Sequence, residues 1–272
     1  MKPGIYYGMS FKDYLAIPAI NSSYLKGYSK TPAHTQLPDK DSKDLRFGRL
    51  LHTYVLEGER KFYDNHYVVG KMDMRKKDNK EKLARLQVEN AGKELVDSQD
   101  VWKLKNMRDI IMLHPTSSAL LKEGTPEITV VWEDPETGLP CKGRIDWLPK
   151  GDFNNVLVDL KKTKNASKYI FRRDHDNYMY FVSTGFYYEG YLRVTGQPLE
   201  TITYMLAEDE PPWRVETYTM NLEYVDIGLN MCHKWLREEV KCREAGFYPP
   251  WSNAGADELD PPMYLKQKGD EE

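Results

Sequence analysis

The most informative stretch of the chain is a short apolar run that ends in charge, Asn155-Val-Leu-Val-Asp-Leu-Lys161. Its length and its branched aliphatic residues are typical of a buried strand. Because residues two apart in a strand point to the same face, we expect Asp159 and Lys161 to emerge side by side, with Leu160 on the opposite face. The run therefore predicts a strand that carries a carboxylate next to an ammonium group.

A hairpin is expected immediately upstream of this strand. Residues 127–132 are β-branched and aromatic, residues 134–138 are rich in turn formers, and residues 141–148 form a second run. Asp146 lies in that second run, 13 residues before Asp159. Antiparallel pairing of successive strands would let the two carboxylates meet. We therefore expect the two carboxylates and the lysine to converge.

Such a trio suits one kind of chemistry. Two carboxylates and a backbone carbonyl can hold Mg²⁺, which prefers oxygen ligands and keeps several waters. The cation polarises a phosphorus centre and lowers the pKa of a bound water. A nearby lysine either orients that water or takes its proton, and it adds positive charge where the transition state gains negative charge. Asp146, Asp159 and Lys161 therefore predict a metal site for phosphodiester hydrolysis.

The rest of the chain indicates an α/β fold, with a mixed central sheet flanked by helices and a helical N-terminal portion. Ser10 and Asn21 have the settings of N-caps that open two short helices. Periodicity then predicts helices at 44–57, 75–95, 99–113, 176–194 and 222–245, and strands at 201–207 and 214–220.

The chain shows no internal repeat and no linker rich in proline or glycine. We therefore expect one domain over residues 1–250. Residues 1–115 should be mainly helical, and residues 116–250 should hold the catalytic sheet. Residues 251–272 are rich in acidic side chains and are expected to form a tail that repels DNA.

Composition narrows the class of protein. The 272 residues are 40% hydrophobic and 30% charged, which excludes disorder as the main state. No stretch is long and apolar enough for a membrane span or a signal peptide. Three cysteines without a C-x-x-C pair argue against a disulfide framework, a structural zinc site and an iron–sulfur cluster. We expect a soluble protein of a reducing intracellular compartment, without a membrane partner.

A net charge of -3 means that DNA binding would need a local basic patch. The best candidate is residues 160–173, which contain no acidic residue. Beyond the catalytic lysine, its cationic members are Lys162, Lys164, Lys168, Arg172 and Arg173. Tyr169 and Phe171 lie among them and either stack on bases or belong to the core. The mixed charges of residues 71–82 favour a solvated surface, with a DNA contact as the alternative.

Six pieces of sequence carry a family resemblance, in the same order, over roughly residues 10 to 250. They are Asn21-Ser-Ser-Tyr-Leu25 followed by Thr31-Pro32, Gly48-Arg-Leu-Leu-His52, Glu127-Ile-Thr-Val-Val-Trp132, Gly143-Arg-Ile-Asp146, Val158-Asp-Leu-Lys-Lys-Thr163, and a tyrosine-rich helix around Tyr178 to Tyr187. Together they resemble the PD-(D/E)xK nuclease superfamily. Within it they are most similar to the RecE-type, exonuclease VIII-like exonucleases of phage recombination systems.

The resemblance implies a restriction-endonuclease-like core and a set of site residues. Mg²⁺, with Mn²⁺ as a substitute, would be held by His52, Asp146, Asp159 and the carbonyl group of Leu160. Lys161 would be the catalytic lysine, and Glu127 would support a second metal or its water shell. Without the resemblance, His52 on an apolar helix face would be interpreted as a hydrogen-bonded core histidine.

The resemblance also implies an activity and partners. Its members digest one strand of linear double-stranded DNA processively from 5′ to 3′ and leave a 3′ single-stranded tail for an annealing protein. They close into homo-oligomeric rings around the DNA. By this likeness the chain would act in the cytoplasm of a bacterial host cell.

The sequence departs from the family pattern at two positions. Ile145 precedes Asp146 where the superfamily has proline. Ser183 stands where the family has a glutamine one turn before a tyrosine, here Tyr187. Because serine is shorter, a water or another residue must fill that place. Two other functions stay open: a structure-specific endonuclease that uses the same site, and a non-catalytic DNA-binding recombination scaffold.

Overall fold

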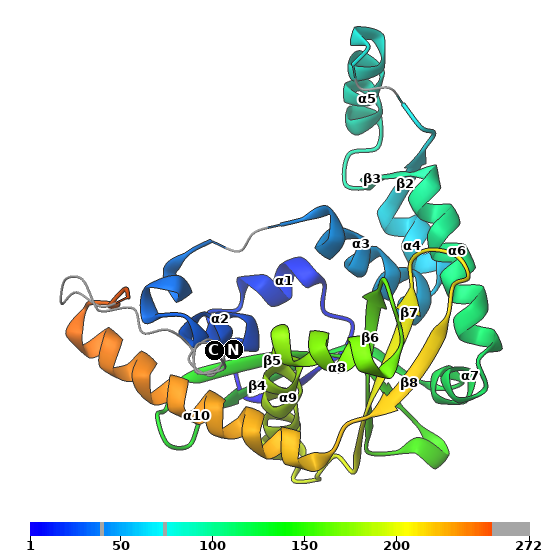
Figure 1. Cartoon of the computed structure of the whole chain (residues 1–272). Helices are drawn as coiled ribbons and strands as arrows, with labels where there is room; N and C mark the ends of the chain where they lie inside the picture. Colours follow the sequence, from blue (N-terminus) through cyan, green and yellow to red (C-terminus); the bar gives the residue numbers. More distant parts are fainter. Residues whose placement is uncertain (39–40, 73–74, 252–272) are drawn as a thin grey trace, which may run out of the picture.

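A six-stranded mixed sheet forms the centre of the molecule (Figure 1). The computed structural model describes residues 1–38, 41–72 and 75–251. The strands lie in the order β1-β4-β5-β6-β7-β8, and all neighbours are antiparallel except β6 and β7, which run parallel. Their bounds are β1 (Gly4–Tyr6), β4 (Gly124–Glu133), β5 (Pro140–Pro149), β6 (Val156–Thr163), β7 (Thr201–Glu208) and β8 (Val215–Thr219). The predicted α/β class, with its mixed sheet, is confirmed.

Helices flank this sheet, and a small parallel sheet of β2 (His66–Val69) and β3 (Glu94–Asp97) stands apart from it. The helices are α1 (Phe11–Ala16), α2 (Ser22–Lys26), α3 (Lys43–His52), α4 (Glu59–Asn65), α5 (Lys77–Glu89), α6 (Ser98–Leu113), α7 (Pro115–Leu121), α8 (Lys168–Asn177), α9 (Tyr180–Thr195) and α10 (Leu222–Ala245). A π-helical turn, Thr53–Glu57, continues α3.

The sheet is covered on both faces. On one face α2, α9 and α10 pack over a first core, which includes Leu157 and Phe186. On the other face α3, α6 and α7 pack over a second core, which includes Leu51 and Leu160. Val158 also belongs to the second core, so successive residues of β6 are buried on opposite faces. This double burial explains why β6 is a continuous apolar run in the sequence.

Several local predictions are confirmed. Ser10 caps α1 by accepting a hydrogen bond from the amide of Asp13, and Asn21 caps α2 in the same way from Tyr24. The helices expected at 99–113 and 222–245 are α6 and α10.

Two helix predictions are wrong in part. The helix expected at 75–95 is only α5, because the chain leaves the helix after Glu89, passes Gly92 at a φ of 95° and enters β3. The helix expected at 176–194 corresponds to α9, which begins only at Tyr180, and residues 176–177 are the end of a separate helix, α8. Met179, at a φ of 47°, takes the left-handed conformation that ends one helix and lets the next begin in a new direction.

Among the described residues, none of the helices combines the length and the apolar character that a membrane crossing requires. The acidic tail expected at 251–272 lies outside the described residues, apart from Trp251.

Candidate active site

Side chains from three elements meet at a gap between β5 and β6. Trp147 of β5 pairs with Val158 of β6, but two residues further along β6 the backbone of Leu160 is bound by side chains. Its amide donates to Oδ2 of Asp146 at 2.9 Å, and its carbonyl oxygen lies 2.8 Å from Nε2 of His52. The two backbone groups that a neighbouring strand would use are therefore held by a carboxylate and an imidazole.

The helix α3 brings His52 to this gap. Ser42 caps the helix by accepting a hydrogen bond from the amide of Leu45 at 3.1 Å. Phe47, Leu50 and Leu51 of α3 are buried in the second core, against the face of the sheet that includes Leu160. His52 follows directly and ends the helix, so core packing fixes its place beside β6.

The imidazole of His52 is surrounded by acceptors. Its Nδ1 lies 3.2 Å from Oε1 of Glu127, and its Nε2 lies 3.7 Å from Oδ2 of Asp146. Burial disfavours the charged imidazole, but Asp146 and Glu127 outweigh it and raise the pKa of His52 to about 9. Burial also disfavours the charged form of Asp146 and so raises the pKa of that carboxyl group, although the charge of His52 acts in the opposite direction. At neutral pH His52 is therefore cationic and can donate to both the Leu160 carbonyl and Glu127.

The strands are irregular where Glu127 and Asp146 face each other. Pro126 pairs with Trp147 and Ile128 with Ile145, which places Glu127 opposite Asp146. Glu127 has a φ of 50°, a left-handed conformation that costs energy in a residue with a Cβ. Ile145 packs in the first core but Trp147, two residues later, packs in the second. The regular alternation of β5 is therefore interrupted at Asp146.

Glu127 is held from two sides. Its second carboxylate oxygen accepts a hydrogen bond from the guanidinium group of Arg144, while the first faces His52. Burial opposes the negative charge of Glu127, but His52 and Arg144 outweigh burial and lower its pKa. Glu127 is thus an anion that holds the imidazole in place. The resemblance implies that Glu127 supports a second metal or its water shell. That role is compatible with the contact between Glu127 and His52.

Lys161 and Asp159 point to the opposite face from Leu160, as the alternation of β6 predicts. The ammonium group of Lys161 donates to Oδ1 of Asp159 and lies 4.0 Å from Oδ2 of Asp146. It also lies 5.3 Å from the centre of the Tyr180 ring. Burial opposes its charge, but Asp159 and Asp146 outweigh burial and raise the pKa of Lys161. Lys161 therefore stays protonated, which suits stabilisation of negative charge in a transition state better than abstraction of a proton.

The donor set fits a divalent cation. One ligand atom each from His52, Glu127 and Asp146 lie within 4.8 Å of one another, and the Leu160 carbonyl oxygen adjoins Nε2. Carboxylate and carbonyl oxygens with one imidazole suit Mg²⁺ or Mn²⁺, provided that the imidazole is neutral. Asp159 lies outside this group of three; one of its carboxylate oxygens, Oδ1, accepts a hydrogen bond from Lys161, so only its other oxygen could bind a cation.

The predicted DNA-binding residues fall into two sets. Lys162 pairs with Asp44 at 2.6 Å and with Asp209 at 3.4 Å, and Lys164 pairs with Asp209 and Glu210. Their charges are thus partly neutralised by acidic residues that are distant in sequence. The second set is Lys168, Arg172 and Arg173, which are exposed on α8. Arg173 lies 3.6 Å from the neighbouring Asp174.

The two aromatic residues of the basic run also differ. Tyr169 is 81% exposed and lies beside the cationic side chains of α8, whereas Phe171 is buried in the first core. The structure therefore leaves Tyr169 available for stacking on a base and assigns Phe171 to packing.

Sequence reasoning missed Lys26 at the end of α2. Its ammonium group donates to the carbonyl of Tyr178 at 3.0 Å and lies 5.8 Å from the centre of the Tyr180 ring. Burial and the charge of Lys161 lower the pKa of Lys26 to about 8. A second cation therefore stands beside the site. Nothing in the local pattern marks it, since only the tertiary fold brings α2 to β6.

Ser183, the residue at the family's glutamine position, contacts α2. Its hydroxyl accepts a hydrogen bond from Ser22 at 3.2 Å. Tyr187, one turn later, is affected by the site, because burial and then Asp146 raise its pKa to about 12. The helix α9 thus borders the site through Tyr187, while Ser183 joins α9 to α2.

Comparisons with known proteins agree with this fold. A family model described as a PDDEXK-like domain of unknown function (DUF3799) matches residues 10–255. A crystal structure from Eubacterium rectale named "Putative exonuclease" has a similar fold, with a TM-score of 0.58 and 12% identity over 97% of this chain and 98% of that one. The crystal structure of SSO0001 is less similar, with a TM-score of 0.31 and 14% identity over 70% of this chain and 86% of that one.

No curated protein matches the sequence. The family model, however, covers the whole region that holds the six pieces of resemblance, from the capped helices to the end of α10. The resemblance to the PD-(D/E)xK nuclease superfamily is therefore confirmed, and the chain belongs to the PDDEXK-like domain family.

Proposed function

We propose that the chain is a metal-dependent deoxyribonuclease that digests one strand of linear double-stranded DNA from the 5′ end. The observation that carries this proposal is the convergence of His52, Asp146 and the Leu160 carbonyl beside the ammonium group of Lys161. Ligands for a cation and a fixed positive charge within one small site are what phosphodiester hydrolysis requires.

His52, Asp146, Asp159 and the carbonyl oxygen of Leu160 would hold Mg²⁺, or Mn²⁺ in its place. When bound, such a cation polarises the phosphodiester and lowers the pKa of a coordinated water. Lys161 would place its charge next to the phosphoryl oxygens, where negative charge grows during the reaction. Asp159 keeps that ammonium group in position, and Glu127 keeps the imidazole in position.

The family resemblance supports the remaining parts of the proposal. They are the 5′ to 3′ direction, the 3′ single-stranded product, a ring of identical chains around the DNA, and a single-strand annealing protein as partner. The name of the structural neighbour from Eubacterium rectale agrees with an exonuclease. The exposed cations of α8 would contact the DNA backbone near the site.

One experiment tests both the chemistry and the need for a DNA end. Linear duplex DNA carrying a 5′ or a 3′ label is incubated with Mg²⁺, Mn²⁺ or a chelator, beside a covalently closed plasmid. The expected result is early release of the 5′ label, no release with the chelator, and an intact plasmid. Cleavage of the plasmid would favour the endonuclease, and metal-independent binding without any hydrolysis would favour the scaffold.

A further inference from the structure

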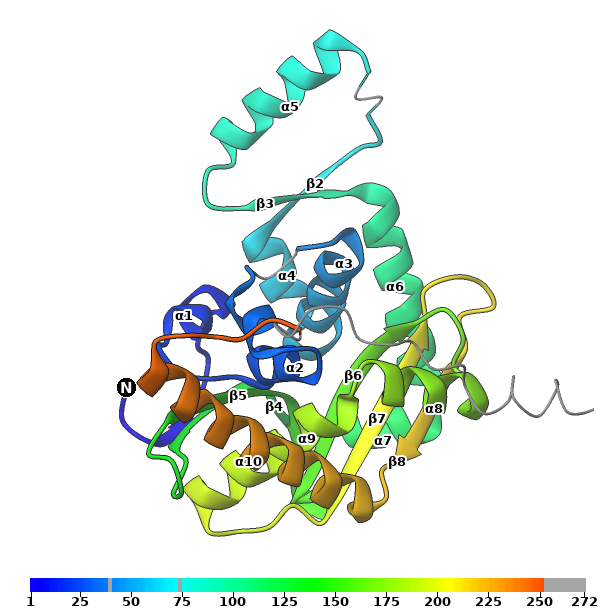
Figure 2. The same ribbon diagram turned by 60° about the vertical axis from the view of Figure 1, so that its left-hand side comes forward.

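The helix α5 stands away from the body of the molecule as an arm. In two views of the ribbon it projects beyond α3, α4 and α6, and only β2 and β3 connect it to them (Figures 1 and 2). No residue of α5 is buried. Helices of globular proteins usually gain their stability by burying one face, so a helix without a buried face is a feature to explain.

The base of the arm is firmly joined to the helix that carries His52. Arg46 of α3 pairs with Glu94 of β3 and donates to the carbonyl of Leu95 at 2.6 Å. His66 of β2 lies 3.6 Å from the same glutamate. Lys93 donates to the carbonyl of Tyr63 at 2.8 Å. The arm therefore has a fixed origin next to α3, and its free part begins beyond these contacts.

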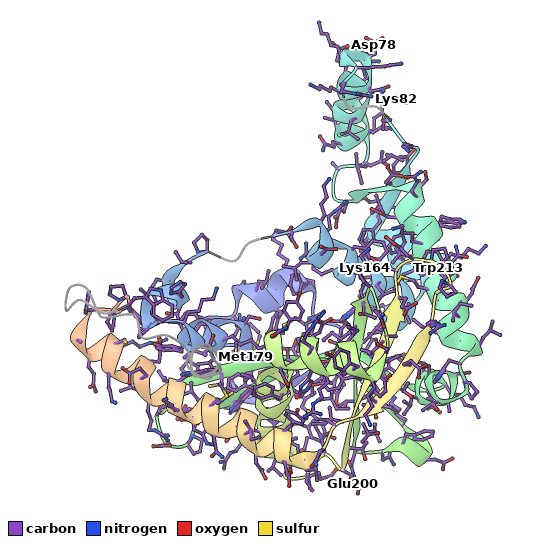
Figure 3. The ribbon with its side chains drawn as sticks, in the orientation of Figure 1. Asp78, Lys82, Lys164, Met179, Glu200 and Trp213 are labelled. Carbon is purple, nitrogen blue, oxygen red and sulfur yellow. The ribbon has the colours of Figure 1, made fainter. Side chains whose placement is uncertain are left out.

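The charge of the arm differs from that of the chain. Residues 75–89 hold six cationic and three anionic side chains, although the whole chain is negative. With 3.6 residues per turn, Lys76 at the N-cap and Lys80 share one flank of α5 that has no carboxylate, whereas Lys77 lies beside Glu81. Lys77 lies 3.8 Å from Glu81, while no ion pair joins Lys76 or Lys80 to a residue within the described ranges. Figure 3 shows the side chains of α5, among them Lys82, extending from the exposed arm.

We propose that this lysine flank of α5 contacts the phosphate backbone of the DNA duplex at a distance from the cleaved end. The inference rests on the proposed function for the identity of the substrate. A 13-residue helix is about 20 Å long, enough to follow several phosphates of one strand. Cationic side chains on a projecting helix attract a polyanion whatever its sequence, which suits an enzyme that must hold any DNA.

A second copy of the chain is the less suitable occupant. Interfaces between stable subunits have apolar centres and are depleted in lysine. On α5 the leucines, Leu83 and Leu86, are only partly exposed, and lysines lie around them. A DNA duplex, with a negative charge about every 1.7 Å along its axis, also attracts these lysines more strongly than a chain whose net charge is -3.

The test compares two double variants of the full chain that change charge equally. Lys76→Glu with Lys80→Glu alters the arm, and Lys234→Glu with Lys241→Glu alters α10 on the far side of the sheet (Figure 1). Binding of a fluorescent 40-base-pair duplex is measured in chelator over a series of salt concentrations. The arm variant should bind at least tenfold more weakly, and its plot of log affinity against log salt should be less steep by about two. The α10 variant should match the parent.

Hydrolysis of bis(p-nitrophenyl) phosphate with Mn²⁺ separates failure of this proposal from failure of the proposed function. Both variants should keep the parental rate, because neither pair touches the site. If the parent hydrolyses no phosphodiester but the arm variant still loses DNA affinity, the nuclease proposal fails and the arm proposal stands. Equal affinities and slopes for the two variants would overturn the arm proposal. So would a smaller oligomer with unchanged DNA affinity, since that result would assign α5 to contacts between chains.

Discussion

His52 and Asp146 take the places of a neighbouring strand beside Leu160, and their nearest side-chain atoms, Nε2 and Oδ2, are 3.7 Å apart. A cation bound between them must displace the proton from Nε2, because a protonated imidazole has no free lone pair. The strand gap is therefore a place where protons and metal compete.

Metal affinity should consequently rise with pH. The pKa of His52 is about 9, so between pH 9 and about pH 7 each unit by which the pH falls should weaken Mn²⁺ binding roughly tenfold. Below about pH 7 the loss should be steeper, because Asp146 is then protonated as well. Calorimetric titrations in buffers with different ionisation enthalpies would count the protons released. Affinity that stays constant between pH 6 and 9 would show that His52 is not a ligand.

Glu127 sets the position of this pH dependence. Changing Glu127 to Gln removes a negative charge 3.2 Å from Nδ1, so the pKa of His52 should fall and the rise in Mn²⁺ affinity should begin at lower pH. Glu133→Gln, an exposed change on the same strand, is the matched control and should leave the curve in place. A loss of affinity at every pH without a shift of the curve would instead identify Glu127 as a direct ligand.

Lys161 should matter for the rate far more than for the fold. Lys161→Met removes the ammonium group that contacts Asp159 and lies 4.0 Å from Asp146, and we expect the rate of DNA hydrolysis to fall by about 10²–10⁴. The exposed Lys150→Met is the control and should keep the parental rate. Rates come from single-turnover digestion, and circular dichroism checks folding. Parental activity of a folded Lys161→Met protein would reject the assigned site.

The two sets of predicted DNA-binding cations should respond differently. Arg172→Ala on α8 should weaken duplex binding several-fold, because its exposed charge has no ion-pair partner among the described residues. Lys164→Ala should have a smaller effect, since Asp209 and Glu210 already neutralise that ammonium group. Fluorescence anisotropy at fixed salt measures both. The opposite order would place the DNA path along the end of β6 instead of α8.

Two glycine substitutions should change stability in opposite directions. A Cβ at Gly228 would lie 2.2 Å from the carbonyl oxygen of Phe181, so Gly228→Ala should separate α9 from α10 and cost about 1–3 kcal/mol. Gly48 in α3 has open space at that position, and Gly48→Ala should stabilise the helix by about 0.5–1 kcal/mol. Urea unfolding of both variants checks the signs, and equal effects would mean that the packing of α9 on α10 is looser than described.

Much of the sheet could be predicted because its strands carry their own pattern. In β6 the burial of both faces leaves a continuous apolar run, and the alternation of Asp159 with Leu160 is visible directly. The approach of Asp146 to this strand was expected from antiparallel pairing of successive strands, and β5 and β6 do pair in this way. What could not be predicted are the positions where one residue changes the backbone, such as Met179 between α8 and α9.

The surroundings of the site were harder to predict, because they depend on contacts between distant segments. Lys162 pairs with Asp44, which lies 118 residues earlier in the chain. The stretch 160–173 contains no acidic residue, but the fold still brings a carboxylate to one of its lysines. Lys26 reaches Tyr180 only after α2 packs on α9, and no spacing in the sequence reports that contact. Local periodicity carries information about elements, whereas charge balance is decided by the tertiary fold.

Beside Leu160, β5 and β6 are not joined by backbone hydrogen bonds, although both strands lie in the middle of the sheet. A divalent ion bound there by His52, Asp146 and Leu160 would link α3 to both strands. Occupancy should then be felt well away from the chemistry, as slower deuterium uptake at the Leu160 amide and greater resistance of the whole sheet to heat.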